Sequence, residues 1–276
     1  MLKRILTTAC ASLSLLPLIL AGSPATAQNV DLTTGLPAVA APHTLPPDKP
    51  TGVGSCAILW DLTHGVYLFY DPAGYYSQLT DLLATQGISV TTTAAGLDHI
   101  DLSPYNVVVI DLASSFDSPY TPSEVAAIQS FQAHGGGLLI MGDNDQTPNI
   151  NINPVAMAFG TTCGLSSIQP SDLYVNNFIA HTIFSGISTI NMEAAGALRV
   201  SPPSVAAAFE PGGMPVVSVV DLPRTVITGD VDLWTDGFIT IVDNQRFALN
   251  VFHWLCEAGA TPARPSSWGK LKTLYR

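Results

Sequence analysis

Short apolar runs alternate with helical patterns along residues 53–153. Four of these runs predict strands: Cys56–Trp60, Ile88–Thr92, Asn106–Leu112 and Gly137–Met141. Between them, two segments space their apolar residues as one face of a helix does: Tyr75–Gln86 and Pro122–His134. Strands that alternate with helices in this way predict a parallel sheet covered by helices on both faces.

The helix predicted at Pro122–His134 carries a clear start signal. Thr121 is suited to cap it, Pro122 fits its first turn, and Glu124 has the spacing of a capping box. The glycines at 135–137 follow a helix and precede a strand, so they end the helix. A phosphate-binding loop would instead follow a strand and open a helix.

After Asn153 the pattern changes to shorter runs separated by proline and glycine. These runs predict strands at Val200–Pro203, Ala206–Phe209, Val216–Asp221 and Thr225–Thr228. Residues 214–229 predict a hairpin that turns at Leu222-Pro223-Arg224, and Asp243–Ala258 predicts a closing amphipathic helix. We therefore expect one three-layer α/β sandwich over residues 53–262, with a mostly parallel central sheet and a C-terminal β-hairpin addition.

The first 27 residues have the features of a secretory signal peptide. Lys3 and Arg4 precede an apolar run that is too short to span a bilayer, and Ala25-Thr26-Ala27 offers a cleavage site. An uncleaved anchor is the alternative interpretation. Residues 28–52 are rich in proline and predict a linker. We expect a secreted or periplasmic protein with no membrane span in the mature chain.

Charge narrows the choice of partners. The net charge is −11, and residues 50–198 contain no Lys or Arg, so the surface repels phosphate backbones and a nucleic-acid partner is excluded. Basic residues gather instead in a C-terminal tail, residues 263–276. The tail from Ser266 to Arg276 has two interpretations: it packs on its own acidic domain, or it docks on a partner through Trp268 and Tyr275.

Three cysteines remain after cleavage: Cys56, Cys163 and Cys256. An oxidising compartment allows one disulfide and leaves one thiol, and the sequence does not choose the pair. No spacing of cysteine and histidine typical of a zinc site occurs.

Acidic residues follow several predicted strands, at the edge of a parallel sheet where ligands bind. Asp61 and His64 follow the first strand, and Asp111 ends the third. Two other strands end in the pattern Gly-Asp-x-Asp, at Gly142–Asp145 and Gly229–Asp232. If these two turns are neighbours, we expect their acids to converge near Asp61 and His64.

Three interpretations of these acids stay open. Asp143, Asp145, Asp230 and Asp232 could bind Ca²⁺ or Mg²⁺. A carboxylate pair could instead hydrolyse a glycan or similar substrate, with Asp143, Asp230 and His64 as the catalytic candidates. The third interpretation is that each Asp caps a helix or binds turn amides. The residues predicted to bind a ligand are Asp61, His64, Asp143, Asn144, Asp230, Asp232 and Trp234.

Four segments in this order resemble the class I glutamine amidotransferase-like superfamily: ILWDLTHG, YNVVVIDL, TPSEVAAIQSFQAHGGGLLIMGD and VITGDVDLWTDGFITIVDNQRFALNVFHWL. The resemblance implies a flavodoxin-like fold. Within the superfamily, the chain is similar to a degenerate bacterial branch. This branch lies beside auxiliary components of gliding-motility transporters, an intraflagellar-transport subunit and trehalose-utilisation-like proteins.

The departures from this family bear on activity. The family's nucleophilic cysteine would follow the strand at Leu138–Met141, where this chain has Gly142-Asp143-Asn144. The family's later histidine would lie near Asp230–Trp234, and none is present there. Glutamine hydrolysis then has no mechanism. We expect a non-catalytic binding module for a small ligand, a glycan or an envelope protein. The alternative is the carboxylate- or metal-dependent hydrolase.

Overall fold

The structure of the protein, a computed structural model, describes residues 56–257. The predicted signal peptide (1–27), linker (28–52) and basic tail (263–276) lie outside the described residues.

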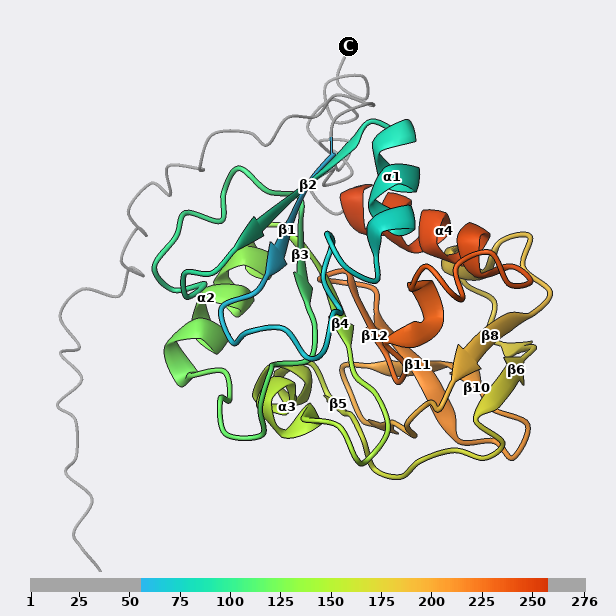
Figure 1. Cartoon of the computed structure of the whole chain (residues 1–276). Helices are drawn as coiled ribbons and strands as arrows, with labels where there is room; N and C mark the ends of the chain where they lie inside the picture. Colours follow the sequence, from blue (N-terminus) through green and yellow to red (C-terminus); the bar gives the residue numbers. More distant parts are fainter. Residues whose placement is uncertain (1–55, 258–276) are drawn as a thin grey trace, which may run out of the picture. The chain divides into compact units, whose positions relative to one another are not determined.

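An eight-stranded sheet forms the centre of the described domain, in the order β2-β1-β3-β4-β12-β11-β10-β7 (Figure 1). Five adjacent strands run parallel: β2 (Ile88–Thr93), β1 (Cys56–Asp61), β3 (Val107–Ile110), β4 (Gly137–Met141) and β12 (Thr225–Thr228). Three antiparallel strands extend the sheet: β11 (Pro215–Val220), β10 (Val205–Phe209) and β7 (Asn177–Phe178). The parallel part has the strand order of flavodoxin, with β12 in the fifth position, so the expected fold class is confirmed.

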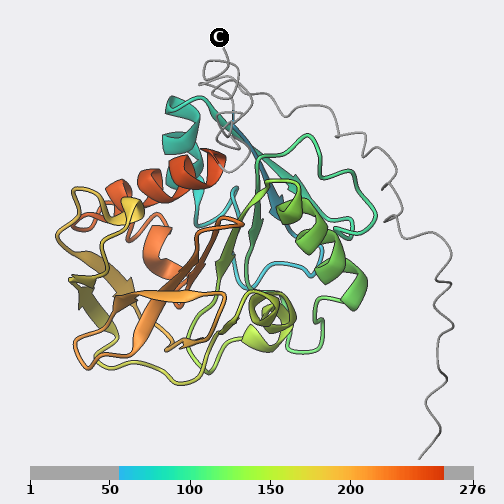
Figure 2. The ribbon, with the colours of Figure 1, turned by 180° about the vertical axis from the view of Figure 1, so that it is seen from behind.

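Helices cover both faces of the sheet, as Figures 1 and 2 show from opposite sides. Helices α1 (Ser77–Thr85) and α4 (Asn244–Cys256) pack together on one face. Helices α2 (Pro122–Ala133) and α3 (Asn149–Ala158) pack together on the other. Strands β3 and β4 are fully buried between these layers, which explains their unbroken apolar sequences.

The start of α2 has the predicted geometry. The Thr121 hydroxyl accepts a hydrogen bond from the Glu124 backbone N–H (3.3 Å). The Glu124 carboxylate in turn accepts one from the Thr121 backbone N–H (2.8 Å). This reciprocal capping box satisfies two N–H groups that the helix leaves unpaired, and it fixes the position of Glu124.

The second half of the domain departs from the sequence pattern in three places. Helix α3 was not predicted, because it contains Pro154 and several asparagines, which disfavour a helix. The strand predicted at Val200–Pro203 shrinks to β9 (Arg199–Val200), which pairs with β5 (Thr161–Thr162). A two-stranded ribbon of β6 (Asp172–Val175) and β8 (Ile190–Glu193) was also missed.

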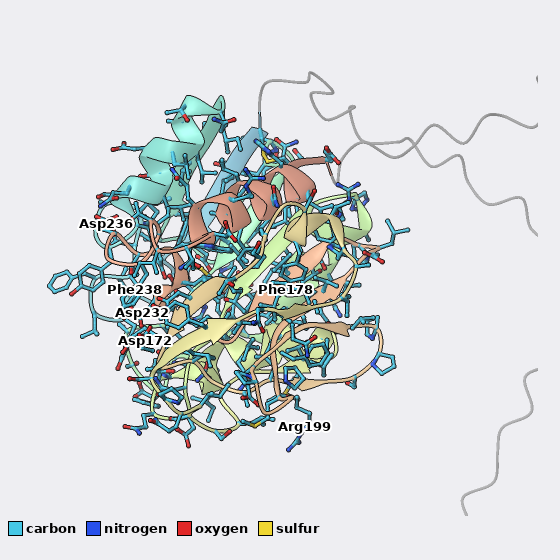
Figure 3. All side chains as sticks on the ribbon, turned by 90° about the vertical axis from the view of Figure 1, so that its right-hand side faces the viewer. Asp172, Phe178, Arg199, Asp232, Asp236 and Phe238 are labelled. Atoms are coloured by element: carbon cyan, nitrogen blue, oxygen red, sulfur yellow. A yellow bond between two sulfur atoms is a disulfide. The ribbon has the colours of Figure 1, made fainter. Side chains whose placement is uncertain are left out.

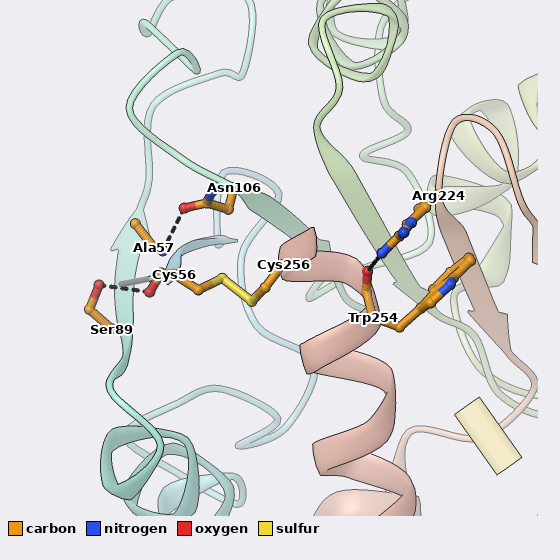
Figure 4. Close-up of a disulfide and its surroundings, with 7 residues drawn as sticks. All are labelled: Cys56, Ala57, Ser89, Asn106, Arg224, Trp254 and Cys256. Atoms are coloured by element: carbon orange, nitrogen blue, oxygen red, sulfur yellow. Dashed lines mark hydrogen bonds between the residues drawn. A yellow bond between two sulfur atoms is a disulfide. The ribbon is translucent and has the colours of Figure 1, made fainter. Parts of the chain in front are cut away.

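The predicted hairpin of β11 and β12 is present. A disulfide links the first strand of the described domain to its last helix. Cys56 at the start of β1 is bonded to Cys256 at the end of α4 (Figure 4). Close by, the Arg224 guanidinium lies 5.2 Å from the centre of the Trp254 ring and donates to the Trp254 carbonyl oxygen. Cys163 is the cysteine left free in this part of the chain. Within residues 56–257 no helix has both the length and the apolar character needed to cross a membrane.

Candidate functional site

The two Gly-Asp turns are neighbours. Strands β4 and β12 pair in parallel with Met141 opposite Thr228, and the Gly142 N–H donates to the Thr228 carbonyl (2.9 Å). Because both strands end at the same edge, Asp143 and Asp230 follow them at the same place. The sequence left the adjacency of these turns open, and the structure shows that they are adjacent.

A third segment crosses these turns closely. The Gly196 N–H donates to the Gly229 carbonyl (2.6 Å). A Cβ atom at Gly196 would lie 2.2 Å from the Asp143 carbonyl oxygen, and one at Gly229 would lie 2.2 Å from the Gly196 carbonyl oxygen. Only glycine fits at these two positions without a shift of the backbone. The crossing segment thus holds both turns in place.

Four carboxyl groups at this edge of the sheet are close enough to affect one another's charge, and we refer to Asp111, Asp143, Asp230 and Asp232 as the acidic cluster. Burial raises the pKa of each one above its ordinary value, most strongly for Asp111 and Asp230. The pKa of Asp143 rises to about 7, through burial and the nearby charge of Asp232. Figure 3 labels Asp232 on one side of the molecule, together with Asp236 and Phe238 of the same segment.

Hydrogen bonds fix two members of the acidic cluster. Asp230 accepts from the backbone N–H groups of Glu193 (2.9 Å) and Asp232 (2.7 Å). Asp232 in turn accepts from the Tyr70 hydroxyl (2.8 Å). Asp230 therefore caps backbone donors, as one sequence interpretation proposed, whereas Asp232 is bound by a phenol. The nearby acids also raise the pKa of Asp230.

Asp111 is less well satisfied. Its Oδ1 accepts from the Leu112 N–H (2.7 Å), but its buried Oδ2 has no hydrogen-bond partner among the described residues. The Tyr76 hydroxyl interacts with Asp111 but donates its hydrogen to the Val231 carbonyl (2.9 Å). Because this hydrogen goes to Val231, an ionised Asp111 carboxylate has no hydrogen to share with the phenol oxygen of Tyr76. A protonated Asp111 can itself donate to that oxygen. The raised pKa of Asp111 agrees with a protonated carboxyl group at this position.

Aromatic side chains adjoin the acidic cluster through Tyr70. The Tyr70 ring stacks on Tyr67 (6.2 Å between ring centres) and meets Tyr75 edge-on (5.3 Å). Tyr75 also meets Phe69 edge-on (5.7 Å). We call Tyr67, Phe69, Tyr70 and Tyr75 the aromatic cluster. Phe69 and Tyr75 are 63% and 42% exposed, so this cluster joins the buried acids to the surface.

The predicted metal ligands do not all meet. Asp145 is exposed and its carboxylate accepts from the Ser167 hydroxyl, away from the other three acids. Within residues 56–257 no group of three or more His, Cys, Asp or Glu side chains is placed to hold a metal ion. The structure gives the predicted Ca²⁺ or Mg²⁺ site no support.

Asp61 and His64 belong to a second group of polar residues, which we call the histidine cluster: Asp61, His64, Ser118, Tyr120 and Glu124. The buried Asp61 carboxylate accepts from the Tyr120 hydroxyl (2.6 Å) and from the Thr63 N–H (2.9 Å). The His64 ring packs on the Tyr120 ring (4.2 Å) and contacts Ser118 and Glu124. Burial nevertheless raises the pKa of Asp61.

Trp234 does not face either cluster. Its side chain is 1% exposed and packs against Phe247 and Phe252 of α4, with ring centres 5.5 and 5.9 Å away. It is a residue of the hydrophobic core, and this position does not suit the predicted contact with a ligand. Asn144 remains beside the acidic cluster, where its side chain donates to Asp143 (3.3 Å).

Where the resemblance would place the amidotransferase nucleophile, the turn after β4 reads Gly142-Asp143-Asn144. Cys163 is distant in sequence but lies next to this turn, since a Cβ atom at Gly142 would be 2.8 Å from its sulfur. Burial raises the pKa of the Cys163 thiol to about 12. A thiol in such surroundings stays protonated and is a poor nucleophile.

Sequence reasoning missed Tyr70, Ser118 and Glu124 as site residues. The signal for Tyr70 was present, because residues 67–76 hold an unusual density of aromatic side chains. Glu124 was identified as part of a helix cap, but a cap gives no hint that its second oxygen faces a histidine. Ser118 had no signal, since its position depends on contacts with α3.

Solved structures of similar fold include the N-terminal domain of mmIFT52. It has a TM-score of 0.62 and 15% identity, and the match covers 72% of this chain and 97% of that one. For the cytoplasmic protein STM3548 from Salmonella typhimurium these values are 0.53, 10%, 73% and 98%. For a glutamine amidotransferase from Methylobacillus flagellatus they are 0.47, 11%, 75% and 96%.

No protein-family model and no curated protein matches the chain. At these identities the likeness concerns the fold alone. The chain has a flavodoxin-like α/β fold, as the sequence predicted.

Proposed function

We propose that the protein is a secreted binding module that uses an amidotransferase-like fold without glutamine hydrolysis. The observation that carries this proposal is the replacement of the nucleophile. At the turn after β4 the chain places the buried carboxyl of Asp143, and burial raises the pKa of the nearby Cys163 thiol to about 12. The same edge of the sheet is the usual place for a ligand in this class of fold.

The chemistry of this edge favours a ligand with a positive charge and an apolar part. Residues 50–198 contain no Lys or Arg, so nothing in this stretch neutralises the acidic cluster. Aromatic faces attract organic cations, and carboxylates pair with them. The exposed rings of Phe69 and Tyr75 offer the apolar contact. A small amine or quaternary ammonium compound satisfies both requirements.

A compartment outside the cytoplasm agrees with two features of the chain. The first 27 residues have the composition of a signal peptide. The Cys56–Cys256 disulfide persists only where conditions are oxidising. The basic tail offers a separate contact with an envelope protein.

The test is thermal unfolding of residues 28–276 in the presence of spermidine, choline or phenethylamine. A ligand at about 100 times its dissociation constant stabilises the fold by roughly 2.7 kcal/mol. We expect a saturable rise in melting temperature with at least one of these cations. The rise should disappear in Asp232→Asn and in Phe69→Ala.

Asp145→Asn is the matched control, because it removes an exposed acid of the same edge that binds Ser167 instead. It should retain the response. Stabilisation by neutral chitooligosaccharides alone, or by no compound, would contradict the cationic ligand. Ca²⁺ and Mg²⁺, added after a chelator, test the metal in the same assay.

A second candidate function is a carboxylate-dependent hydrolase acting on a glycan. It is favoured by the pKa of Asp143, about 7, which suits a general acid near neutral pH. Hydrolysis of p-nitrophenyl glycosides that is lost in Asp143→Asn would support this candidate. Absence of turnover across a panel of such glycosides would leave the binding module as the better account.

A further inference from the structure

His64 lies between a serine hydroxyl and a buried carboxylate. Its Nδ1 is 3.1 Å from the Ser118 hydroxyl oxygen, and its Nε2 is 3.1 Å from Oε1 of Glu124. The His64 and Glu124 side chains are 10% and 5% exposed, while Ser118 is half-buried. A nucleophile, a base and a group that orients the base are thus joined by two hydrogen bonds.

Contacts with neighbouring residues hold His64 and its two partners in place. The second Glu124 oxygen accepts from the Thr121 N–H (2.8 Å) and the Thr121 hydroxyl (2.9 Å), so Oε1 is left for His64. The His64 ring packs on Tyr120, and the His64 carbonyl accepts from the Ser114 N–H (3.1 Å). These contacts fix the ring between its two partners before any substrate arrives.

Helix α3 positions the serine. The Ser118 N–H donates to the Asn151 side chain (3.1 Å), and the same side chain donates to the Ser115 carbonyl. Asn151 is completely buried, so it clamps the loop of residues 115–118 from the protein interior. A site on a loop needs such support to keep its geometry.

The hydrogen bonds select the histidine tautomer that a base requires. The Glu124 carboxylate can only accept, so the proton of neutral His64 sits on Nε2. Nδ1 then carries the lone pair and accepts the hydrogen of the Ser118 hydroxyl. Either imidazole nitrogen can act as a base, so the use of Nδ1 is no obstacle.

We propose that Ser118, His64 and Glu124 form a serine esterase site for small uncharged esters. The Ser118 oxygen attacks the ester carbonyl carbon while His64 Nδ1 takes its proton. The bond from carbon to the alkoxide oxygen breaks, and His64 returns the proton to the alkoxide, which leaves as an alcohol. His64 then takes a proton from water, whose oxygen attacks the acyl carbon. The bond from this carbon to the Ser118 oxygen breaks, the carboxylic acid leaves, and His64 returns the proton to Ser118.

The surroundings define the substrate class. Phe116 is 57% exposed and lies two positions before Ser118, where it offers an apolar surface to an acyl chain. Asp61 and Glu124 lie next to His64, Asp117 precedes Ser118 in the sequence, and residues 50–198 contain no Lys or Arg, so the charge near the site is negative. A substrate with a carboxylate or phosphate is disfavoured. Ser118 and His64 are the catalytic residues of this proposal, and Glu124 is a positioning residue.

The first test is labelling of residues 28–276 with diisopropyl fluorophosphate, an uncharged probe of activated serines, followed by mass spectrometry of the peptides. We expect one adduct, on Ser118. Turnover of p-nitrophenyl butyrate should fall to the background of buffer in Ser118→Ala. Ser115→Ala is the matched control, because Ser115 lies on the same loop but bonds Asp117 rather than a histidine.

Glu124→Gln tests the positioning role without loss of the helix cap, since glutamine also completes a capping box. The two Thr121 donors require an oxygen at the Oε2 position, so the amide nitrogen faces His64. That nitrogen donates to Nε2 and shifts the imidazole proton to Nδ1, which then cannot accept from Ser118. We expect kcat to fall by roughly 100-fold or more with little change in KM.

Three results would overturn the proposal: no adduct on Ser118, unchanged turnover in Ser118→Ala, or a Glu124→Gln variant that keeps the kcat of the parent while folding normally. None of them bears on the cationic ligand, whose binding depends on Asp232 and Phe69. The binding module and the esterase therefore fail separately. Far-ultraviolet circular dichroism and the melting temperature of each variant show that its fold is intact.

Discussion

The acidic cluster and the histidine cluster occupy the same edge of one sheet but solve the burial of carboxyl groups differently. In the histidine cluster, Asp61 and Glu124 each find donors from a phenol, an imidazole, a hydroxyl or a backbone N–H. In the acidic cluster, neighbouring carboxyl groups raise one another's pKa, and one oxygen of Asp111 has no partner in the described part of the chain.

This difference concerns protons more than shape. A carboxylate with several donors can keep its charge when buried, whereas carboxyl groups that share a site raise one another's pKa. The histidine cluster is thus a set of matched hydrogen bonds, suited to moving one proton along a fixed path. In the acidic cluster the raised pKa values favour protonated carboxyl groups, and a bound cation would displace these protons.

The largest expected effect on stability comes from removing the disulfide of the domain that contains both clusters. The Cys56–Cys256 bond closes 200 residues at the opposite end of β1 from the clusters. Replacement of both cysteines by serine should lower the free energy of unfolding by up to about 5 kcal/mol, as chain entropy predicts for so long a loop. Urea unfolding measures this. The pH dependence of stability should stay the same, and a change in it would mean that the clusters are coupled to the disulfide.

The acidic cluster should make stability depend on pH. An unfolded chain titrates Asp143 near 3.8, whereas in the folded chain its pKa is about 7. Below pH 3.8 both states hold the proton. As pH rises, the unfolded state releases a proton that the folded state retains, so stability falls until about pH 7. The shift corresponds to a loss on the order of 4 kcal/mol from Asp143.

Asp143→Asn should remove this part of the pH dependence. Asparagine is neutral and still accepts from Asn144, so the variant should be more stable relative to its parent at pH 7 than at pH 4. Asp145→Asn is the control, since that exposed acid lies outside the cluster, and it should leave the pH profile unchanged. If Asp143→Asn keeps the slope of its parent, Asp143 is ionised in the folded protein at neutral pH.

The sequence was informative about where the acids lie and silent about how they pair. Glycine followed by aspartate at two strand ends placed Asp143 and Asp230 at one edge of the sheet, because parallel strands end at one edge. That the two strands are neighbours came from the structure. The partners come from elsewhere. Tyr70 contacts Asp232 from the long loop before α1. Ser118 is positioned by an asparagine of α3, and Pro154 within this helix prevented its prediction from the sequence. Such contacts are set by tertiary packing, which leaves no periodic trace.

A matched pair of phenol deletions sharpens the comparison. Tyr120→Phe removes the donor to the buried Asp61 (2.6 Å), and we expect a loss of about 1–3 kcal/mol because that oxygen is left unpaired. Tyr70→Phe removes the donor to Asp232 (2.8 Å), which is partly exposed and can bind water, so we expect about 0.5–1.5 kcal/mol. Urea unfolding of both variants at one pH ranks them. A larger loss in Tyr70→Phe would reverse the assignment of the better-paired cluster.

The smallest effect tests whether a helix cap positions the histidine cluster. Thr121→Ala removes the hydroxyl that accepts from the Glu124 N–H and donates to its carboxylate. A lost N-cap costs about 1 kcal/mol. We also expect the contact between Glu124 and His64 to weaken. The Glu124 carboxylate then keeps only the Thr121 backbone N–H and gains freedom to turn away from His64. Nuclear magnetic resonance of the His64 imidazole detects such a change. An unaltered imidazole spectrum with the expected loss of stability would show that packing on Tyr120, and not the cap, holds the ring.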